Sequence, residues 1–540
     1  MGWQELTTKE WDCIVVGTGM GGSVLGLMLA KAGWRVLFIE RGRHHLQDVE
    51  SLRGNYAETF FDPSDFPQEK HGELLSHAGR YGEPLIISNK PRPYLHIPFI
   101  GSGTGGSTAL YGMALERFFP SDFKPAAAHP SSAVRLPEEW PFSYEDLEPY
   151  YGKAERLFGA RGTVDPLRPS GDAPVLGTPP VLSPLSELAI RHFESKRLHP
   201  YRIPMACGNV PDCAVCQGYL CPKDCKRDAA TAALVPAITA HGAGLLDRCT
   251  VTRLHATADR VERVVCERDG RAFTVTAPLV VLAAGALNTP RILLSSSNDH
   301  WPTGLGNRSG QVGRNLMRHY TDLYAVTLGP EMDNRHKQIA FNDFYNGPGG
   351  KLGTVQSFGR LPPASTLAES VKADIAKSAF RRVVPLYQVV KPILKRVLAR
   401  MVDASVVLAT ICEDLPHPDN RVRVVDGRLH LRYTIDAYDQ GRIASLRRLM
   451  REALLPLRYR LINQAENPGL LAHVCGTCRA GTLPAESVVD QHNRCHDLEN
   501  LYVVDASFFP SSGGTNPALT IAANAMRVAD HLLRRPAAAR

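Results

Sequence analysis

Two short apolar runs near the start of the chain flank a segment of small residues. Cys13–Val16 has the continuous hydrophobicity of a buried strand, and Arg35–Glu40 repeats that pattern. Ser23–Ala32 lies between them and carries the small apolar residues of a closely packed helix. A strand, a helix and a second strand in this order predict the first unit of a parallel sheet.

Patterns of strands and helices of this α/β type occur twice more along the chain. A helix is expected near 229–241, strands near 244–269 and a buried strand over Leu279–Ala284. At the end of the chain, a strand over Leu501–Asp505 precedes a helix from about Pro517. A dinucleotide-binding fold assembled from separated pieces is therefore predicted.

The middle of the chain has a different pattern. Apolar and charged residues alternate in Arg421–Val425 and in Leu429–Tyr433, which predicts antiparallel strands, and two long helical stretches accompany them. The overall prediction is an α/β protein, with a Rossmann-like domain and an inserted α+β substrate-binding or cap domain that contains an antiparallel sheet. The expected bounds are 1–125, 226–324 and 466–540 for the first domain, and 126–225 and 325–465 for the second.

Composition narrows the possible partners. The chain has 540 residues, of which 44% are hydrophobic and 21% charged, as in an ordinary globular enzyme. A net charge of +8 over this length is weak evidence for nucleic-acid binding, so no nucleic-acid partner is expected. No apolar run approaches the ~20 residues that span a bilayer, and no secretory signal is visible. The default expectation is a cytoplasmic location.

A glycine-rich turn links the first strand to the first helix. Gly17, Thr18, Gly19, Met20, Gly21 and Gly22 fit the spacing G-x-G-x-x-G. Glycines there permit a tight turn, a close approach of the backbone to a pyrophosphate and close helix–strand packing. Glu40 ends the next strand, where its carboxylate can accept hydrogen bonds from ribose hydroxyls. The turn predicts a dinucleotide site but leaves FAD and NAD open.

Several other segments resemble one family. They are a second glycine loop at Gly103–Met113, a turn and helix start at Gly285–Leu293, Gly310–His319, His473–Thr477, Asp505–Pro510 and Asn516–Thr520. In this order they resemble the glucose–methanol–choline (GMC) oxidoreductases, flavoproteins that oxidise alcohols. The resemblance is discontinuous and is weakest from about 325 to 465.

This resemblance implies FAD as the cofactor. Some members tether the flavin through a histidine in the second glycine loop, whereas Leu110 and Tyr111 stand there in this chain, so FAD is expected to bind without a covalent bond. Besides the first glycine turn and Glu40, the implied FAD contacts are Arg41, Gly103, Gly105, Gly106, Ser107, Val251, Ala284, Asp505, Ala506, Asn516, Pro517 and Thr520.

Alcohol oxidation needs a base for the hydroxyl proton and a carbon-bound hydrogen held against the flavin. His473 matches the position of the family's base, and imidazole suits that role near neutral pH. Asn516 matches the partner position, where an amide can bind the substrate oxygen. The expected reaction is oxidation of a small-molecule alcohol, with oxygen, a quinone or a protein as electron acceptor. The alternative is a flavin-containing lyase of the same fold.

Five cysteines fall close together at 207, 213, 216, 221 and 225. Three interpretations are open. Packed structural thiols come first, because many relatives carry cysteines here without a metal. An iron–sulfur cluster on Cys213, Cys216, Cys221 and Cys225 is the second, and structural zinc is the third. Cys475 and Cys478, on either side of the base motif, are expected to be packed residues rather than redox-active ones.

The stretch 377–400 contains seven basic residues and no acidic one, interleaved with aliphatic residues at roughly helical spacing. One interpretation is a peripheral membrane contact or a lid that delivers a lipophilic substrate. The other, which the pattern favours, is an amphipathic helix packed on the protein with a solvated basic face.

Overall fold

The computed structural model of the chain describes most of its residues. Described are 3–61, 71–88, 93–208, 210, 213–328, 337–347, 350–364, 367–368, 386–403, 405–467 and 471–535, without the side chains of 400–403.

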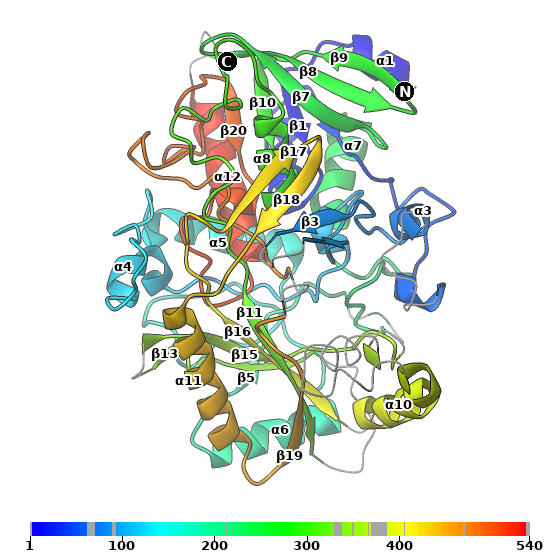
Figure 1. Ribbon diagram of the computed structural model, residues 1–540, viewed down its shortest axis with the longest axis vertical. Coiled ribbons are helices and arrows are strands. Elements are labelled where there is room, and N and C mark those ends of the chain that lie inside the picture. Colours follow the sequence, from blue (N-terminus) through cyan, green and yellow to red (C-terminus); the bar gives the residue numbers. More distant parts are fainter. Residues whose placement is uncertain are drawn as a thin grey trace.

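A five-stranded parallel sheet occupies one half of the molecule (Figure 1). Its order is β20 (Leu501–Val503), β10 (Leu279–Leu282), β1 (Cys13–Val16), β2 (Val36–Ile39) and β6 (Gly244–Leu246). The pairs are all parallel. The sheet thus joins strands from three separated parts of the chain.

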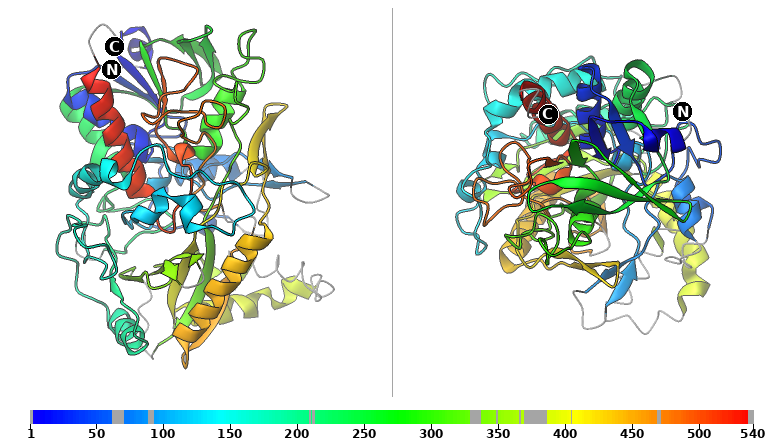
Figure 2. Two further views of the ribbon diagram at one scale, coloured as in Figure 1. Left: turned by 90° about the vertical axis from the view of Figure 1, so that its left-hand side faces the viewer. Right: turned by 90° about the horizontal axis from the view of Figure 1, so that it is seen from above.

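Helices close one face of this sheet. α2 (Met20–Lys31) packs between α12 (Ala518–Arg534) and α7 (Val235–His241), and α5 (Tyr144–Phe158) packs on α12. The C-terminal end of α12 lies at the same end of the molecule as α1 (Trp3–Thr8) (Figure 2). The start of α12 therefore points toward the centre of the molecule.

A three-stranded antiparallel sheet extends this half of the molecule. It consists of β7 (Thr250–Ala256), β8 (Val261–Arg268) and β9 (Arg271–Val275), and α8 (Gly285–Leu294) packs against β7. The sequence placed these elements correctly in outline. The predicted helix near 229–241 begins with a π-helical segment, Ala230–Leu234, before α7.

The other half is built on a six-stranded antiparallel sheet. Its order is β19 (Arg458–Asn463), β11 (Tyr320–Thr327), β16 (Val406–Cys412), β15 (Gly353–Ser357), β12 (Ile339–Phe341) and β5 (Tyr201–Arg202). Apolar side chains of α6 (Pro184–Ser195) and α11 (Ala437–Leu454) join the strands in a second hydrophobic core. The expected combination of a Rossmann-like parallel sheet and a separate antiparallel sheet is confirmed.

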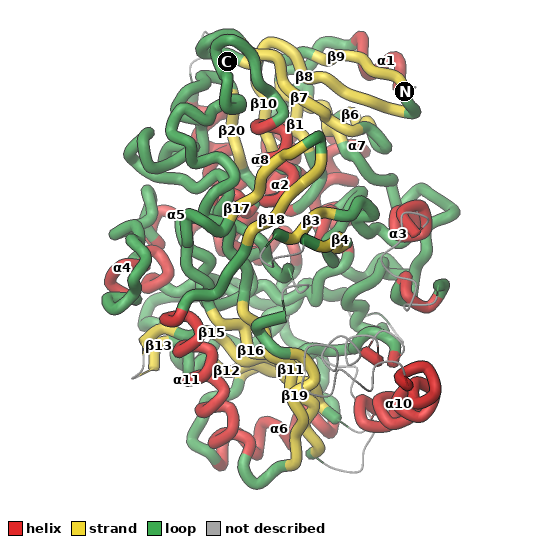
Figure 3. The backbone as a smooth tube through the Cα atoms, in the orientation of Figure 1, coloured by secondary structure: helices red, strands yellow, loops and turns green. Residues whose placement is uncertain are grey.

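A small four-stranded sheet lies between the two halves (Figure 3). It contains β3 (Leu85–Ile87), β4 (Tyr94–His96), β17 (Arg421–Val425) and β18 (Arg428–Arg432), and β18 pairs with β3 in parallel. The predicted hairpin of the middle segment is therefore tied to the first hundred residues. The remaining short elements are α3 (Gly72–His77), α4 (Pro125–Ala128), β13 (Asn346–Gly347) and β14 (Gly350–Lys351).

Candidate active site

A cavity of about 1240 Å³ lies between the two halves. One end is lined by the first glycine turn, the ends of β2 and β10, and the start of α12. The other end is lined by residues of the antiparallel sheet and its loops, including Leu323, Phe358, Leu361, Leu367, Ile411 and Ile462. The cavity is therefore long enough to hold two different groups end to end.

The first glycine turn has little room for side chains, except on the cavity side. Gly17 has a φ of +100°, and a Cβ at Gly21 would lie 2.1 Å from the carbonyl oxygen of Val504. Gly19 precedes α2, and a Cβ there would meet nothing within 4 Å. The helix start thus faces an open space with free backbone amides, as an anion site requires.

Glu40 ties three segments together at this end. Its carboxylate accepts hydrogen bonds from Thr18 (N at 3.0 Å, Oγ1 at 2.7 Å), from the Gly42 amide at 2.9 Å and from the Gly103 amide at 3.0 Å. The residue also lines the cavity. Glu40 therefore also holds these segments together, which the sequence did not predict, and its expected ribose contact stays a prediction.

The second glycine loop touches the first. A Cβ at Gly106 would lie 2.9 Å from the Cα of Gly19, so two glycine backbones form one wall of the cavity without side chains. Ser107, Leu110 and Tyr111 also line the cavity, and the Tyr111 hydroxyl donates to the Arg227 carbonyl at 2.6 Å.

Most of the other predicted cofactor residues line the same end. They are Gly17, Thr18, Gly19, Met20, Gly21, Arg41, Val251, Ala284, Asp505, Ala506 and Pro517. The Asp505 carboxylate accepts from Thr289 Oγ1 at 2.5 Å and from the Gly285 amide at 2.9 Å, and burial raises its pKa.

A few predicted contacts lie behind this wall. Gly22, Gly103 and Gly105 do not line the cavity. Thr520 is also outside its lining, and its hydroxyl is bonded to that of Tyr151 at 2.8 Å. The FAD contact expected of Thr520 stays a prediction.

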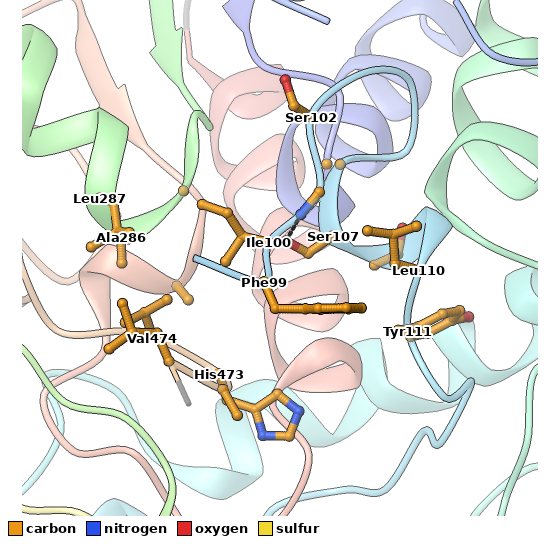
Figure 4. A pocket seen from close by; sticks show the side chains of 18 of the residues that line it. Phe99, Ile100, Ser102, Ser107, Leu110, Tyr111, Ala286, Leu287, His473 and Val474 are labelled. Carbon is orange, nitrogen blue, oxygen red and sulfur yellow. Dashed lines mark hydrogen bonds between the residues drawn. The ribbon is translucent and has the colours of Figure 1, made fainter. Parts of the chain in front are cut away.

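The predicted base, His473, lines this cavity next to Val474 in the chain (Figure 4). Its segment pairs with the one before β11, because Met317 and Cys475 exchange backbone hydrogen bonds of 3.0 Å. The His319 amide bonds the Ala472 carbonyl at 3.1 Å in the same ladder. His473 has a φ of +57°, a left-handed conformation that a side chain adopts at a cost, and this ladder holds it there.

A second histidine contacts the first. His473 Nδ1 lies 2.8 Å from His319 Nδ1, while His319 Nε2 lies 2.9 Å from the Gly513 carbonyl oxygen and 3.2 Å from that of Ser512. Burial lowers the pKa of His319 to about 4. Burial, with repulsion from His319 and Lys337, holds the pKa of His473 well below its usual range. Both rings are therefore neutral near pH 7.

The predicted partner, Asn516, is paired with Gln356. Asn516 Nδ2 donates to Gln356 Oε1 at 3.0 Å, and Gln356 Nε2 donates to Asn516 Oδ1 at 3.3 Å. Both amides line the cavity that His473 lines. Since the Asn516 amide carries two N–H groups, one remains for a ligand oxygen.

Lys337 is an ammonium group in the cavity that the sequence did not predict. Only 5% of the residue is exposed, and its Nζ makes no hydrogen bond or ion pair with a described residue. Burial lowers its pKa to about 8, which attraction to Glu116 only partly offsets. A buried cation with no acceptor among the described residues favours a ligand that supplies an oxygen at this end of the cavity.

The five clustered cysteines converge near the cavity. The Sγ–Sγ distances are 3.6 Å for Cys207–Cys213, 3.5 Å for Cys213–Cys225 and 3.6 Å for Cys221–Cys225. Tyr56 packs on the cluster and lines the cavity. Thiolates about one tetrahedral ion with bonds of ~2.3 Å lie ~3.8 Å apart, close to these three distances. Among the described residues, the cysteines whose sulfurs all lie within 4.8 Å of one another are Cys207, Cys213 and Cys225, and Cys221 does not join them. Thiolates that bind different irons of a cluster lie further apart.

Cys475 and Cys478 are fully buried beneath His473, and burial raises the pKa of both thiols well above the usual range. They are packed thiols, as expected.

These features define an oxidoreductase site in which a dinucleotide end and a base-bearing end share one cavity. The N-terminal GMC oxidoreductase family model matches residues 12–321, and the C-terminal one matches 416–525. The chain therefore belongs to the GMC oxidoreductase family, and is an enzyme that acts on alcohol CH–OH groups.

Relatives of known activity match almost the whole chain. The 6'''-hydroxyparomomycin C oxidase of Streptomyces lividus is 29% identical, over 97% of this chain and 92% of its own. The 2-methyl-1,2-propanediol dehydrogenase of Mycolicibacterium austroafricanum is 25% identical, over 98% and 96%. The crystal structure of pyridoxine 4-oxidase from Mesorbium loti has a TM-score of 0.62 at 21% identity, covering 98% of this chain and 100% of that one, and shares the fold.

GMC oxidoreductases bind FAD, and the residues present fit that group. The open helix start at Gly19 suits the pyrophosphate, and the side-chain-free wall at Gly106 leaves room beside it.

Proposed function

We propose that this enzyme oxidises an alcohol to the corresponding carbonyl compound, with FAD bound non-covalently at the glycine end of the cavity. Bound FAD supplies the hydride acceptor. His473 takes the hydroxyl proton on Nε2, and the Asn516 amide holds the substrate oxygen. The observation that supports this proposal is that His473 and Asn516 line one cavity together with the first glycine turn.

The histidine is suited to the proposed role by its surroundings. Its Nδ1 is engaged by His319, and Nε2 has no hydrogen-bond partner among the described residues. Because its pKa is lowered, the free base is present throughout the neutral range. The Gln356–Asn516 pair fixes the amide, so the substrate oxygen is bound in one orientation.

Anaerobic mixing of the FAD-loaded enzyme with candidate alcohols tests this function. Oxidation predicts bleaching of the visible flavin band without any added acceptor. A lyase of this fold turns over while its flavin stays oxidised, so product formation without bleaching would contradict the proposal. Assays with oxygen, a quinone dye and a protein acceptor then identify the electron acceptor.

The cavity supports a substrate class. Its substrate end is lined mostly by aliphatic and aromatic side chains, with Lys337 as a buried ammonium. We infer that neutral lipophilic alcohols or alcohols with an acidic group are preferred, and that amine-bearing alcohols are disfavoured by repulsion. A panel of primary alcohols that differ only in a methyl, carboxylate or ammonium end tests this. A higher kcat/KM for the ammonium compound would contradict it.

The cysteine cluster supports a single metal ion over an iron–sulfur cluster. We propose that Cys207, Cys213 and Cys225 bind one metal ion of the zinc class, because their sulfurs all lie within 4.8 Å of one another. Metal analysis of anaerobically purified protein should give about one zinc and no iron. Iron with inorganic sulfide would favour the cluster, and absence of metal would leave packed thiols.

The basic stretch forms α10 (Tyr387–Asp403), while its residues 377–385 lie outside the described residues. Tyr387, Leu394 and Leu398 pack α10 toward Leu367, which lines the cavity. The outer face exposes an apolar stripe at helical spacing, namely Leu386, Val389, Val390, Ile393 and Val397. The helix packs on the protein, as the favoured interpretation expected, and its solvated face carries these apolar side chains beside basic ones.

We propose that α10 docks on an anionic lipid surface, since exposed Lys395 and Arg396 adjoin the stripe. Co-sedimentation with phosphatidylglycerol vesicles should fall at least about ten-fold on changing Val389 and Ile393 to serine. Val181→Ser, at a residue 89% exposed elsewhere, is the matched control. Equal binding of all three proteins would contradict the proposal, and a dimer lost only in the double variant would assign the stripe to a second copy.

A further inference from the structure

The two histidines leave only one arrangement of protons when both rings are neutral. Carbonyl oxygens can only accept, so His319 Nε2, which faces Gly513 and Ser512, must carry a hydrogen. Neutral imidazole has one N–H, and therefore His319 Nδ1 is an acceptor. His473 Nδ1, 2.8 Å away, must then donate to it. The hydrogen of His473 lies on Nδ1, and its Nε2 carries the lone pair.

We propose that His319 is a positioning residue that holds His473 in the tautomer able to accept a proton from the substrate. This inference rests on the proposed role of His473. A neutral imidazole in water favours the other tautomer slightly, and that form would present an N–H instead of a lone pair to the substrate. The backbone carbonyls of residues 512 and 513 thus fix the tautomer of His473 through the imidazole ring of His319.

The same contact supports the protonated base. When the substrate O–H bond breaks, its proton forms a bond with His473 Nε2, and the oxygen keeps the electron pair. His473 becomes an imidazolium whose Nδ1–H still donates to His319 Nδ1, and such a charge-assisted hydrogen bond is stronger than the neutral one. No proton has to leave the pair during the step.

A neutral acceptor differs from a carboxylate in this position. A carboxylate beside His473 would raise the pKa of the imidazole, whereas His319 helps to lower it. Glu413 attracts and Lys351 repels a proton on His319, and burial outweighs both. Glu413 and Lys351 are paired with each other and with His129 and Asp122 in a buried charge network, and burial keeps His319 neutral.

Two substitutions separate positioning from a general structural role. His319→Leu removes the acceptor, and His319→Asn places an amide oxygen near the position of Nδ1. His192→Leu is the control, because its ring also bonds a backbone carbonyl, that of Ala453, but lies outside the cavity lining. FAD content and Tm are measured for all three.

The rate of anaerobic flavin reduction by substrate should fall about 10- to 100-fold in His319→Leu, with KM nearly unchanged. Both tautomers of His473 hold the same number of protons, so the loss should be equal at every pH above the acid limb. His319→Asn should recover most of the rate, and His192→Leu should react like the wild type.

A His319→Leu enzyme that keeps its FAD and reacts at the wild-type rate would overturn the inference. So would a loss confined to low pH, which would assign His319 an electrostatic effect only. If His473→Ala is slow in the same assay while His319→Leu is not, the positioning role fails and the base remains. If His473→Ala is also unaffected, the proposed function itself fails.

Discussion

Individual side chains of the cavity determine its acid–base behaviour. Since the pKa of His473 is lowered below its usual value, the neutral base persists on the acid side of pH 6.5. The kcat/KM profile should therefore stay on its plateau below that pH and fall only as the pH drops through the lowered pKa. A kcat/KM that already decreases as the pH is lowered toward 7 would contradict this interpretation of the site.

Lys337→Met should change that profile in a definite direction. Burial is the larger cause of the lowered pKa of His473, and repulsion from Lys337 adds to it. Without the ammonium group the pKa of His473 rises, so the acid limb of kcat/KM should move to higher pH. Lys351→Met is unsuitable as a control, because that residue is paired with Asp122 and Glu413.

The same substitution should stabilise the protein near neutral pH. The pKa of Lys337 is about 8 in the folded chain, below its usual value, so its protonated form opposes folding at pH 7. That cost fades as the pH rises from 8 toward 10.5, because the folded form loses the proton first. Lys337→Met should raise the free energy of unfolding at pH 7 by on the order of 3 kcal/mol. Denaturant titration measures this, and a destabilised variant would show that Lys337 has an acceptor in the folded enzyme.

Single residues were predictable where a local pattern carried the signal. Gly19, Glu40 and His473 stand in motifs of contiguous sequence, and the structure brings them to one cavity. Lys337 and Gln356 belong to the antiparallel half, and no local sequence motif distinguishes them from their neighbours. His319 stands within a segment that resembles the family, but its contact with His473 depends on pairing across a long sequence separation.

At the scale of elements, the glycine turn is the most constrained feature. Gly21 in α2 lies against the end of β20, so Gly21→Ala should push the helix away from the sheet and open the FAD end. FAD content at purification should fall at least about five-fold, within the effect of a clash of 1–3 kcal/mol.

A glycine in an open helical position gives the matched control. A Cβ at Gly441 in α11 would meet nothing within 4 Å. Gly441→Ala should leave FAD bound and raise stability by about 0.5–1 kcal/mol. Equal FAD content in the two variants would show that the turn does not hold the cofactor.

Element types were predicted more accurately than their ends. Helix α2 begins at Met20 rather than at the predicted Ser23, because Gly19 already has the extended backbone of an N-cap. Two strands of the small central sheet, β3 and β4, come from a stretch without clear alternation, and the pairing of β3 with β18 had no signal in the sequence. The proposed division into two domains by residue number stays a prediction.

At the scale of the whole molecule, the cavity is built from both halves, so a bound dinucleotide should stabilise the entire fold. FAD at about 100 times its Kd should add about 2.7 kcal/mol to the free energy of unfolding of the apoprotein. Thermal unfolding with increasing FAD measures this shift, and NAD is the control. An equal shift with NAD would contradict the assignment of the site to FAD.

The central claim is that His473 removes the hydroxyl proton of an alcohol bound beside FAD. Stopped-flow measurement of anaerobic flavin reduction, with wild type and His473→Ala matched for FAD content, tests it most directly. The rate should be lower by at least about 100-fold in His473→Ala, the loss expected for a general base. Reduction of the two enzymes at the same rate would contradict it.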